Sequence, residues 1–288
     1  MSYKSIIENT KRPNTISTLL HDLRVLGIAE GDIVLVHSSL SALGWVCGGV
    51  PAVVAALLNA VGGSGTIVMP SFTIDNIDPA VCGDYPPAEP DQDNPPDRGR
   101  LFPLPVPKEW HDIIRDNIPA YDKVISPCSK GLGRIAEYFR TYPGTLRSDH
   151  PGVSFTANGI HAQQIVGNHP LSPNFGMVSP LGVLYRLGAK VLLLGTSYKR
   201  CTTFHLSEDL SEKFPKITHS SVIMENGVRV WKSYENYDCD DSKFNALGEA
   251  CEREGLMHLG KVGSADCKLF DMKTVVDFGV KWIIENYE

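Results

Sequence analysis

The residues best suited to proton transfer are His205 and Glu208, in the segment TTFHLSE at positions 202–208. They are three positions apart, so on a helix they share one face. A carboxylate beside an imidazole fixes its tautomer and stabilises its charged form, as a general base requires. The alternative is a structural His–Glu pair. HExxH is absent and HxxE supplies only half of a ligand set, so no metal is predicted.

A second candidate region is HSSLSALGWVCGG at positions 37–49, which follows a predicted buried strand. In parallel α/β sheets, ligands bind beyond the carboxyl ends of the strands. Glycines allow close approach of the backbone, and hydroxyls near a helix start suit an anion. GxGxxG and GxxxxGK[ST] are both absent, so the composition alone leaves two interpretations open, an anion site and a tight turn.

A third region is RSDHPGVS at positions 147–154. Arg147 and His150 carry or accept positive charge, while Ser148 and Ser154 offer hydroxyl donors. Together they could hold phosphates, with the arginine acting as a fork. An ordinary surface loop with an Arg–Asp contact explains the same residues.

Other nucleophile schemes find little support. The GxSxG motif of an α/β-hydrolase is missing. Cys201 is near His205 in sequence, but proximity in sequence does not bring a thiol to an imidazole, so we do not expect a Cys–His pair. The seven cysteines are scattered without CxxC spacing, which favours reduced thiols over zinc knuckles or disulfides.

Composition narrows the class of protein. The chain has 288 residues, of which 42% are hydrophobic and 21% charged, as in ordinary globular proteins. Its formal net charge of −6 argues against a nucleic-acid partner. The N-terminal sequence lacks an apolar signal core, and the apolar runs are too short to cross a bilayer. We therefore expect a cytoplasmic protein with no membrane partner.

The candidate residues need a scaffold, and the first 75 residues predict one. A helix at 15–26 precedes a strand at 32–37, a helix from Pro51, and a strand at 65–69. The last three form a βαβ unit, which favours parallel strands. A third buried strand at 190–194 leads through a loop into the His205 region.

The rest of the chain predicts further helices and one hairpin. Helices are expected at 131–142, 180–187, 243–255 and 273–287, with a strand and then a helix over 155–166. Asn226-Gly227 predicts the turn of a hairpin over 220–230. Residues 77–108 are rich in proline and indicate an irregular insertion. We expect a single domain over 1–288 of the α/β class, with a central, largely parallel sheet flanked by helices and α+β features in the last third.

The three regions, in this order, resemble the aminoglycoside 3-N-acetyltransferase family, which has the antibiotic N-acetyltransferase fold. The resemblance rests on HSSLSALGWVCGG with the helix and strand after it, PGTLRSDHPGVSFTANG, SPLGVLYRLGAKVLLLG and TTFHLSE. It runs from about residue 15 to about residue 215 and is interrupted by the proline-rich stretch.

The resemblance implies direct transfer of an acetyl group from acetyl-CoA to an amine, without a metal. His205 matches the general base, Glu208 its carboxylate partner, and Thr202 a donor to the thioester oxygen. The loop at 38–46 matches the segment along the pantetheine arm, and the Arg147 region matches a motif near the cofactor's phosphates. The predicted cofactor-binding residues are His37, Ser38, Ser39, Leu40, Gly44, Trp45, Val46, Ser71, Arg147, Ser148, His150 and Ser154.

The acceptor stays open at this point. The resemblance implies a small-molecule amine, either an aminoglycoside, as in antibiotic resistance, or a nucleotide-linked amino sugar of surface-polysaccharide synthesis. Resistance members usually have asparagine where this chain has Cys201, and residues 77–108 match nothing in the family. A non-catalytic CoA-binding sensor and a thioester hydrolase are alternatives from other classes, and a homo-oligomer is equally open.

Overall fold

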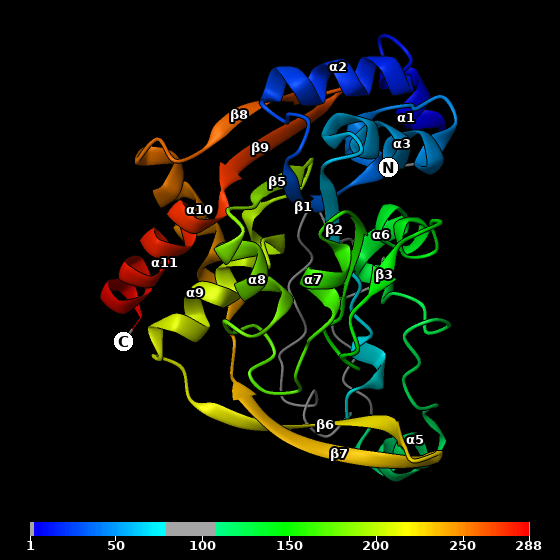
Figure 1. The fold of residues 1–288 in the computed structure, drawn as a ribbon, viewed down its shortest axis with the longest axis vertical. Helices are drawn as coiled ribbons and strands as arrows, with labels where there is room; N and C mark the ends of the chain where they lie inside the picture. Colours follow the sequence, from blue (N-terminus) through cyan, green and yellow to red (C-terminus); the bar gives the residue numbers. More distant parts are fainter. Residues whose placement is uncertain (1–2, 79–106, 288) are drawn as a thin grey trace.

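The computed structural model describes residues 3–78 and 107–287. Within these residues, nine strands form a seven-stranded sheet and a separate two-stranded hairpin (Figure 1). The strands are β1 (Ile33–Ser38), β2 (Thr66–Pro70), β3 (Leu146–Arg147), β4 (Phe155–Gly159), β5 (Lys190–Leu194), β6 (Lys216–Glu225), β7 (Val228–Tyr237), β8 (His258–Val262) and β9 (Ala265–Asp271).

Helices cover both faces of the large sheet. The helices of the described residues are α1 (Tyr3–Asn9), α2 (Ile16–Leu26), α3 (Gly49–Val61), α5 (His111–Asn117), α6 (Gly133–Arg140), α7 (Ala162–Val166), α8 (Pro180–Arg186), α9 (Thr203–Ser211), α10 (Phe244–Arg253) and α11 (Met272–Asn286). Of these, α5 lies beside the β6–β7 hairpin and not against the large sheet (Figure 1). The expected helices of the described regions are thus present, although α3 begins at Gly49 rather than Pro51. Within the described residues no helix is both long and apolar enough to span a membrane.

The large sheet is mixed, with the order β3-β4-β2-β1-β5-β9-β8. The predicted βαβ unit is present, and β1 pairs in parallel with both β2 and β5. The pairs β2–β4, β3–β4, β5–β9 and β8–β9 toward the two edges are all antiparallel, and short connections join β3 to β4 and β8 to β9. The α/β class is confirmed, and its parallel character is concentrated in the three central strands.

Alternation along the central strands divides the core into two parts. Leu35 of β1 packs in one cluster with α7, α8, α9 and α11, whereas its neighbour Val34 packs in the other with α2, α3 and α6. Side chains two positions apart on a strand face the same way. His37 therefore lies on the same face of the sheet as Leu35, which is the face that α9 covers.

The predicted hairpin over 220–230 is confirmed as the longer pair β6–β7, which crosses the lower end of the molecule in Figure 1. Its turn residues Asn226 and Gly227 have φ of 52° and 78°, as a tight hairpin requires. A bridge between Ile77 and Ser221 ties the hairpin to the body of the protein.

The insertion predicted at 77–108 falls largely on residues 79–106, outside the described residues. The single domain over 1–288 stays a prediction. The strands β8 and β9 were not predicted from the sequence.

Candidate functional site

His205 and Glu208 form a close pair on α9. Nδ1 of His205 lies 2.5 Å from Oε2 of Glu208. The Glu208 side chain is fully buried, whereas the His205 side chain is 19% exposed. A carboxylate accepts hydrogen bonds, so Nδ1 of the neutral ring carries the proton and Nε2 carries the free lone pair. The pair has the arrangement of a general base with an orienting carboxylate.

Glu208 is held from a second segment as well. The backbone N–H of Asp240 donates to Oε1 of Glu208 at 2.9 Å. Burial raises the pKa of the adjacent Cys239 thiol well above its ordinary value, and the charge of Glu208 and a hydrogen bond to it raise it further. The buried carboxylate thus receives hydrogen bonds from α9 and from the chain that follows β7. The contact within α9 was predicted from the sequence, whereas the contact with the chain after β7 was not.

Two aromatic rings fix the plane of the His205 imidazole. Phe175 stacks on it with ring centroids 4.8 Å apart and planes 12° from parallel. Phe244 packs against it at 4.9 Å with planes 56° apart. A ring packed against two aromatic side chains loses little orientational freedom when substrate binds.

His37 lies at the end of β1 on the face that α9 covers, and it is only 7% exposed. Burial and, to a smaller extent, the nearby His205 lower the pKa of His37 to about 3, so this ring is neutral at neutral pH. Its Nε2 is buried and finds no hydrogen-bond partner among the described residues. Buried polar atoms in proteins are nearly always paired, so this atom is suited to meet a bound ligand.

Thr202 and Cys201 precede α9. Thr202 is 6% exposed and its carbonyl accepts the N–H of His205 at 3.1 Å. Cys201 is fully buried, and burial raises the pKa of its thiol to about 12. A thiol that stays protonated is a poor nucleophile, which agrees with the expectation that Cys201 does not carry the acetyl group.

The loop after β1 forms a short 3₁₀ turn, η1 (Leu40–Leu43), instead of an open loop. Gly44 has φ of 79°, and a Cβ there would lie 2.7 Å from Oγ of Ser264. The Trp45 N–H donates to Oγ1 of Thr10 at 2.8 Å. The predicted pantetheine segment at 38–46 is therefore clamped between the N-terminal segment and the β8–β9 turn.

The Arg147 guanidinium connects three parts of the chain. It donates to Oγ of Ser154 at 2.9 Å, to the carbonyl of Ser126 at 2.5 Å and to the carbonyl of Ser71 at 2.6 Å. It also lies over the ring of Tyr121, 5.3 Å from the centroid. These N–H donors of the Arg147 guanidinium point into the protein. Few of them are left to donate to a phosphate.

Ser148, and His150 through its Nδ1, are likewise paired inside the protein, whereas Nε2 of His150 is buried with no partner among the described residues. Oγ of Ser148 accepts the N–H of Phe155 and lies 2.9 Å from Nδ1 of His169. Nδ1 of His150 accepts the N–H of Gly152 at 3.1 Å and of Val153 at 3.0 Å. The predicted phosphate contacts of this region stay untested, and these partners favour a structural role.

Replacing Arg147 by lysine is expected to lower the free energy of unfolding by about 1–3 kcal/mol, because a lysine cannot serve three separate acceptors in a buried site. Urea denaturation measures this change. Arg134→Lys on the exposed face of α6 is the matched control and should leave stability within about 0.5 kcal/mol. Equal stability of the two variants would contradict a structural role for Arg147.

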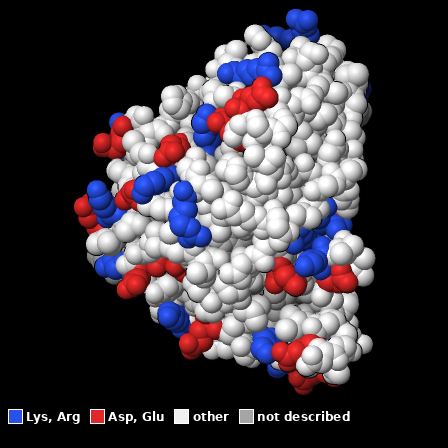
Figure 2. All heavy atoms as spheres, in the orientation of Figure 1, with Lys and Arg blue, Asp and Glu red and all other residues white. Residues whose placement is uncertain are grey.

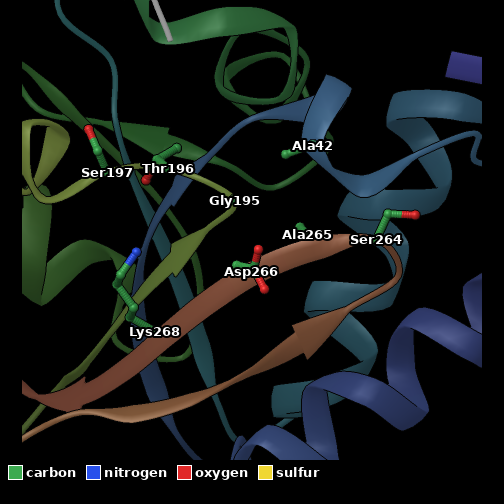
Figure 3. Close-up of a pocket in the computed structure, with 8 residues that line it drawn as sticks. All are labelled: Ala42, Gly195, Thr196, Ser197, Ser264, Ala265, Asp266 and Lys268. Carbon is green, nitrogen blue, oxygen red and sulfur yellow. The ribbon is translucent and has the colours of Figure 1, made fainter. Parts of the chain in front are cut away.

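A pocket opens at the carboxyl ends of β1 and β5 (Figure 3). Its volume is about 290 Å³. It is lined by Ala42, Gly195, Thr196, Ser197, Ser264, Ala265, Asp266 and Lys268. The hydroxyl of Thr196 is buried there without a partner among the described residues. Ala42 belongs to the predicted pantetheine segment, and residues 195–197 lead toward α9.

The charged side chains on the surface do not form a patch of one sign that would indicate a ligand. Figure 2 shows one face, on which lysines and arginines alternate with acidic residues along the margins around a mostly uncharged centre. Pairs such as Lys261–Asp266 and Lys273–Asp277 are of this exposed kind. Interspersed charges of this kind do not produce a strong field for steering a ligand.

Comparison with known proteins connects this geometry to a chemistry. A family model described as Aminoglycoside 3-N-acetyltransferase matches residues 35–284. The chain is 43% identical over 283 residues to the SPbeta prophage-derived aminoglycoside N(3')-acetyltransferase-like protein YokD of Bacillus subtilis strain 168, covering 98% of this chain and 97% of that protein. It is 32% identical over 299 residues to Aminoglycoside N(3)-acetyltransferase IX of Micromonospora chalcea, covering 98% of each.

Solved structures show the same likeness. The crystal structure of YokD superposes with a TM-score of 0.89 at 42% identity, over 98% of each chain. A binary complex of AAC-IIIb with CoASH superposes with a TM-score of 0.77 at 29% identity, over 95% of this chain and 97% of that one.

Proposed function

This chain belongs to the aminoglycoside 3-N-acetyltransferase family, and from this premise we propose that it transfers an acetyl group from acetyl-CoA to an amine of an aminoglycoside or other amino sugar. The observation that carries the proposal is the 2.5 Å contact between Nδ1 of His205 and Oε2 of the buried Glu208. This contact leaves Nε2 of a partly exposed imidazole available to a substrate.

His205 acts as the general base. An alkyl ammonium has a pKa near 10 and is not nucleophilic until it loses a proton, which Nε2 of His205 accepts. The amine nitrogen then forms a bond to the thioester carbon, and the resulting imidazolium is stabilised by Glu208. When the tetrahedral intermediate collapses, the C–S bond breaks and the CoA thiolate takes up the proton held by the His205 imidazolium. The second proton that the nitrogen must lose to become a neutral amide passes to solvent.

The developing oxyanion needs fixed donors. Thr202 lies directly before α9 and keeps its predicted role as a donor to the thioester oxygen. His37 is a second candidate, because its neutral ring lies on the α9 face with Nε2 unpartnered. Neutrality matters here, since a neutral His37 does not place a second positive charge beside the imidazolium of His205.

The cofactor is assigned to the carboxyl edge of the central strands. We place its pantetheine arm along residues 38–46 and beside the pocket of Figure 3. The buried Thr196 hydroxyl in that pocket has no hydrogen-bond partner among the described residues. Ser71, Arg147 and Ser154 hold the adjoining loops together through their mutual hydrogen bonds. Ser148 and His150 bond instead to neighbouring protein groups. Their contribution to cofactor binding is then indirect.

The acceptor is identified by measuring release of free thiol from acetyl-CoA in the presence of different amines. The panel contains several aminoglycosides, UDP- and dTDP-linked amino sugars, and a control without acceptor. We expect release with aminoglycosides only. Release with the nucleotide-linked sugars alone would move the protein to polysaccharide synthesis, and release without acceptor would indicate a hydrolase. CoA binding without any turnover would favour a sensor.

A further inference from the structure

Three side chains of different chemistry meet behind the proposed base. One ligand-type atom from each of His205, Glu208 and Cys239 lies within 4.8 Å of the other two. Imidazole nitrogen, carboxylate oxygen and thiolate sulfur are the donor types that proteins use to bind Zn²⁺. The set combines α9 with the chain after β7, so the folded structure assembles it from positions that are distant in sequence.

The segment that carries Cys239 is anchored on both sides. The Asp238 N–H donates to the carbonyl of Pro215 at 2.8 Å, and the Asp240 N–H donates to Oε1 of Glu208 at 2.9 Å. The Tyr287 hydroxyl donates to the carbonyl of Asp240 at 3.2 Å. These contacts keep the Cys239 sulfur near the Glu208 carboxylate. The ligand atoms are therefore close together before a metal binds.

The geometry needs only small side-chain adjustments to hold an ion. Zn²⁺ binds nitrogen and oxygen at about 2.0–2.2 Å and sulfur at about 2.3 Å, which places tetrahedral ligands roughly 3.3–3.7 Å apart. The His205–Glu208 separation of 2.5 Å therefore has to lengthen, and the widest separation in the set, within 4.8 Å, has to shorten. His205 is 19% exposed and Cys239 is half-buried, so the set is not fully enclosed by protein. The oxygen-preferring Mg²⁺ does not suit this set.

We propose that Nδ1 of His205, Glu208 and Cys239 form an inhibitory site for Zn²⁺ or a similar thiophilic divalent cation. Binding forms bonds from the metal to nitrogen, oxygen and sulfur and releases the thiol proton to solvent. The imidazole stays neutral, and its proton moves from Nδ1 to Nε2. The Zn²⁺ charge then balances one thiolate and one carboxylate, so the buried cluster becomes neutral overall. A fourth position stays available to water.

Metal binding would stop acetyl transfer for a definite reason. With Nδ1 on the metal, Nε2 of His205 carries the proton and has no lone pair to accept one from the substrate amine. This consequence rests on the proposed function, whereas metal binding does not. The two are therefore measured separately.

Binding is tested on the full chain with Co²⁺ as a spectroscopic substitute and with Zn²⁺ by equilibrium dialysis. We expect Co²⁺ to produce a thiolate-to-metal absorption band in wild type, and the band to be absent from Cys239→Ser and Cys239→Ala. Affinity for Zn²⁺ should fall at least about 10-fold in both variants. The control Cys47→Ser removes an exposed cysteine elsewhere and should bind as wild type does. Circular dichroism checks that each variant is folded.

A band and an affinity that are unchanged in the Cys239 variants would overturn the proposal. If neither variant folds, wild type still decides it, because Zn²⁺ should protect Cys239 from alkylation as mapped by peptide mass analysis. Unprotected Cys239 at saturating Zn²⁺ would count against the site. In the activity assay, Zn²⁺ should inhibit wild type and Cys47→Ser at concentrations at least about 10-fold lower than those that inhibit Cys239→Ser, while Mg²⁺ should not inhibit. Binding at Cys239 without inhibition would refute the inhibitory role and leave the metal site in place.

Discussion

Replacing His205 by alanine is expected to lower kcat for acetyl transfer by about 10²–10⁴-fold, the range that a positioned general base contributes. The methyl group cannot accept the proton of the substrate ammonium, and the buried Glu208 loses its imidazole partner. Binding of acetyl-CoA should change little, because the predicted cofactor segment at 38–46 is held by other residues. Thiol release measures turnover, and calorimetric titration measures binding of the cofactor.

Two further variants make this result specific. His258→Ala removes an exposed histidine on β8 and should turn over as wild type does. His205→Gln keeps a polar side chain of similar reach but has no basic nitrogen, so we expect a loss close to that of alanine. Turnover of His205→Ala within a few fold of wild type would remove His205 from the role of base. A loss of cofactor binding in the same variant would point to a structural role instead.

The His205–Glu208 pair could be predicted because its geometry is local. Two residues three apart on a helix are neighbours wherever that helix lies, and the preceding strand β5 placed the helix at the ligand edge of the sheet. The same locality explains the success with the Asn226-Gly227 turn, since both residues adopt positive φ within a single hairpin. Expectations of this kind need no knowledge of tertiary contacts.

The partners of Glu208 could not be predicted, because they come from a distant part of the chain. Asp240 and Cys239 follow β7, more than 30 positions after α9 begins, and only the path of the β6–β7 hairpin brings them back. The hydrogen-bond partners of Arg147 could not be predicted either. Its charge suggested a phosphate ligand, but the carbonyls of Ser71 and Ser126 occupy it from segments that periodicity does not relate to it.

Local sequence patterns predicted the buried central strands of the sheet but not its exposed edge. Strong apolar runs identified β1, β2 and β5, which are buried on both faces. The edge strand β8 exposes most of its side chains and carries a polar sequence, so it lacks the signal of a buried strand. Strand direction is likewise decided by the connections between strands, which is why the antiparallel margin was not foreseen.

Acidification is expected to destabilise this protein steeply between about pH 6.5 and pH 4, through the buried histidines beside the Arg147 region. Burial lowers the pKa of His169 to about 4, against an ordinary value of 6.5 in the unfolded chain. Burial lowers the pKa of His150 well below its ordinary value, and the neighbouring His169 and His219 lower it further. The two rings are 4.6 Å apart, and Nε2 of His169 donates to the carbonyl of Asn174 at 2.8 Å.

The sign follows from proton counting. Between pH 6.5 and pH 4 the unfolded chain binds a proton on His169 that the folded chain does not, so stability falls as pH falls. Each pH unit in this window costs about 1.4 kcal/mol per histidine, and His169 alone accounts for about 3 kcal/mol by pH 4. Above pH 6.5 the contribution is fully present and constant.

Urea denaturation of wild type and His169→Gln at pH 7 and pH 4.5 tests this prediction. The glutamine variant should be less stable at pH 7, because it cannot reproduce both hydrogen bonds of the ring, but its stability should fall less on acidification by about 2–3 kcal/mol. His258→Gln changes an exposed histidine and should follow the wild-type pH dependence. If wild type and His169→Gln lose equal stability between the two pH values, the acid sensitivity arises elsewhere in the protein and His169 is not a neutral buried group.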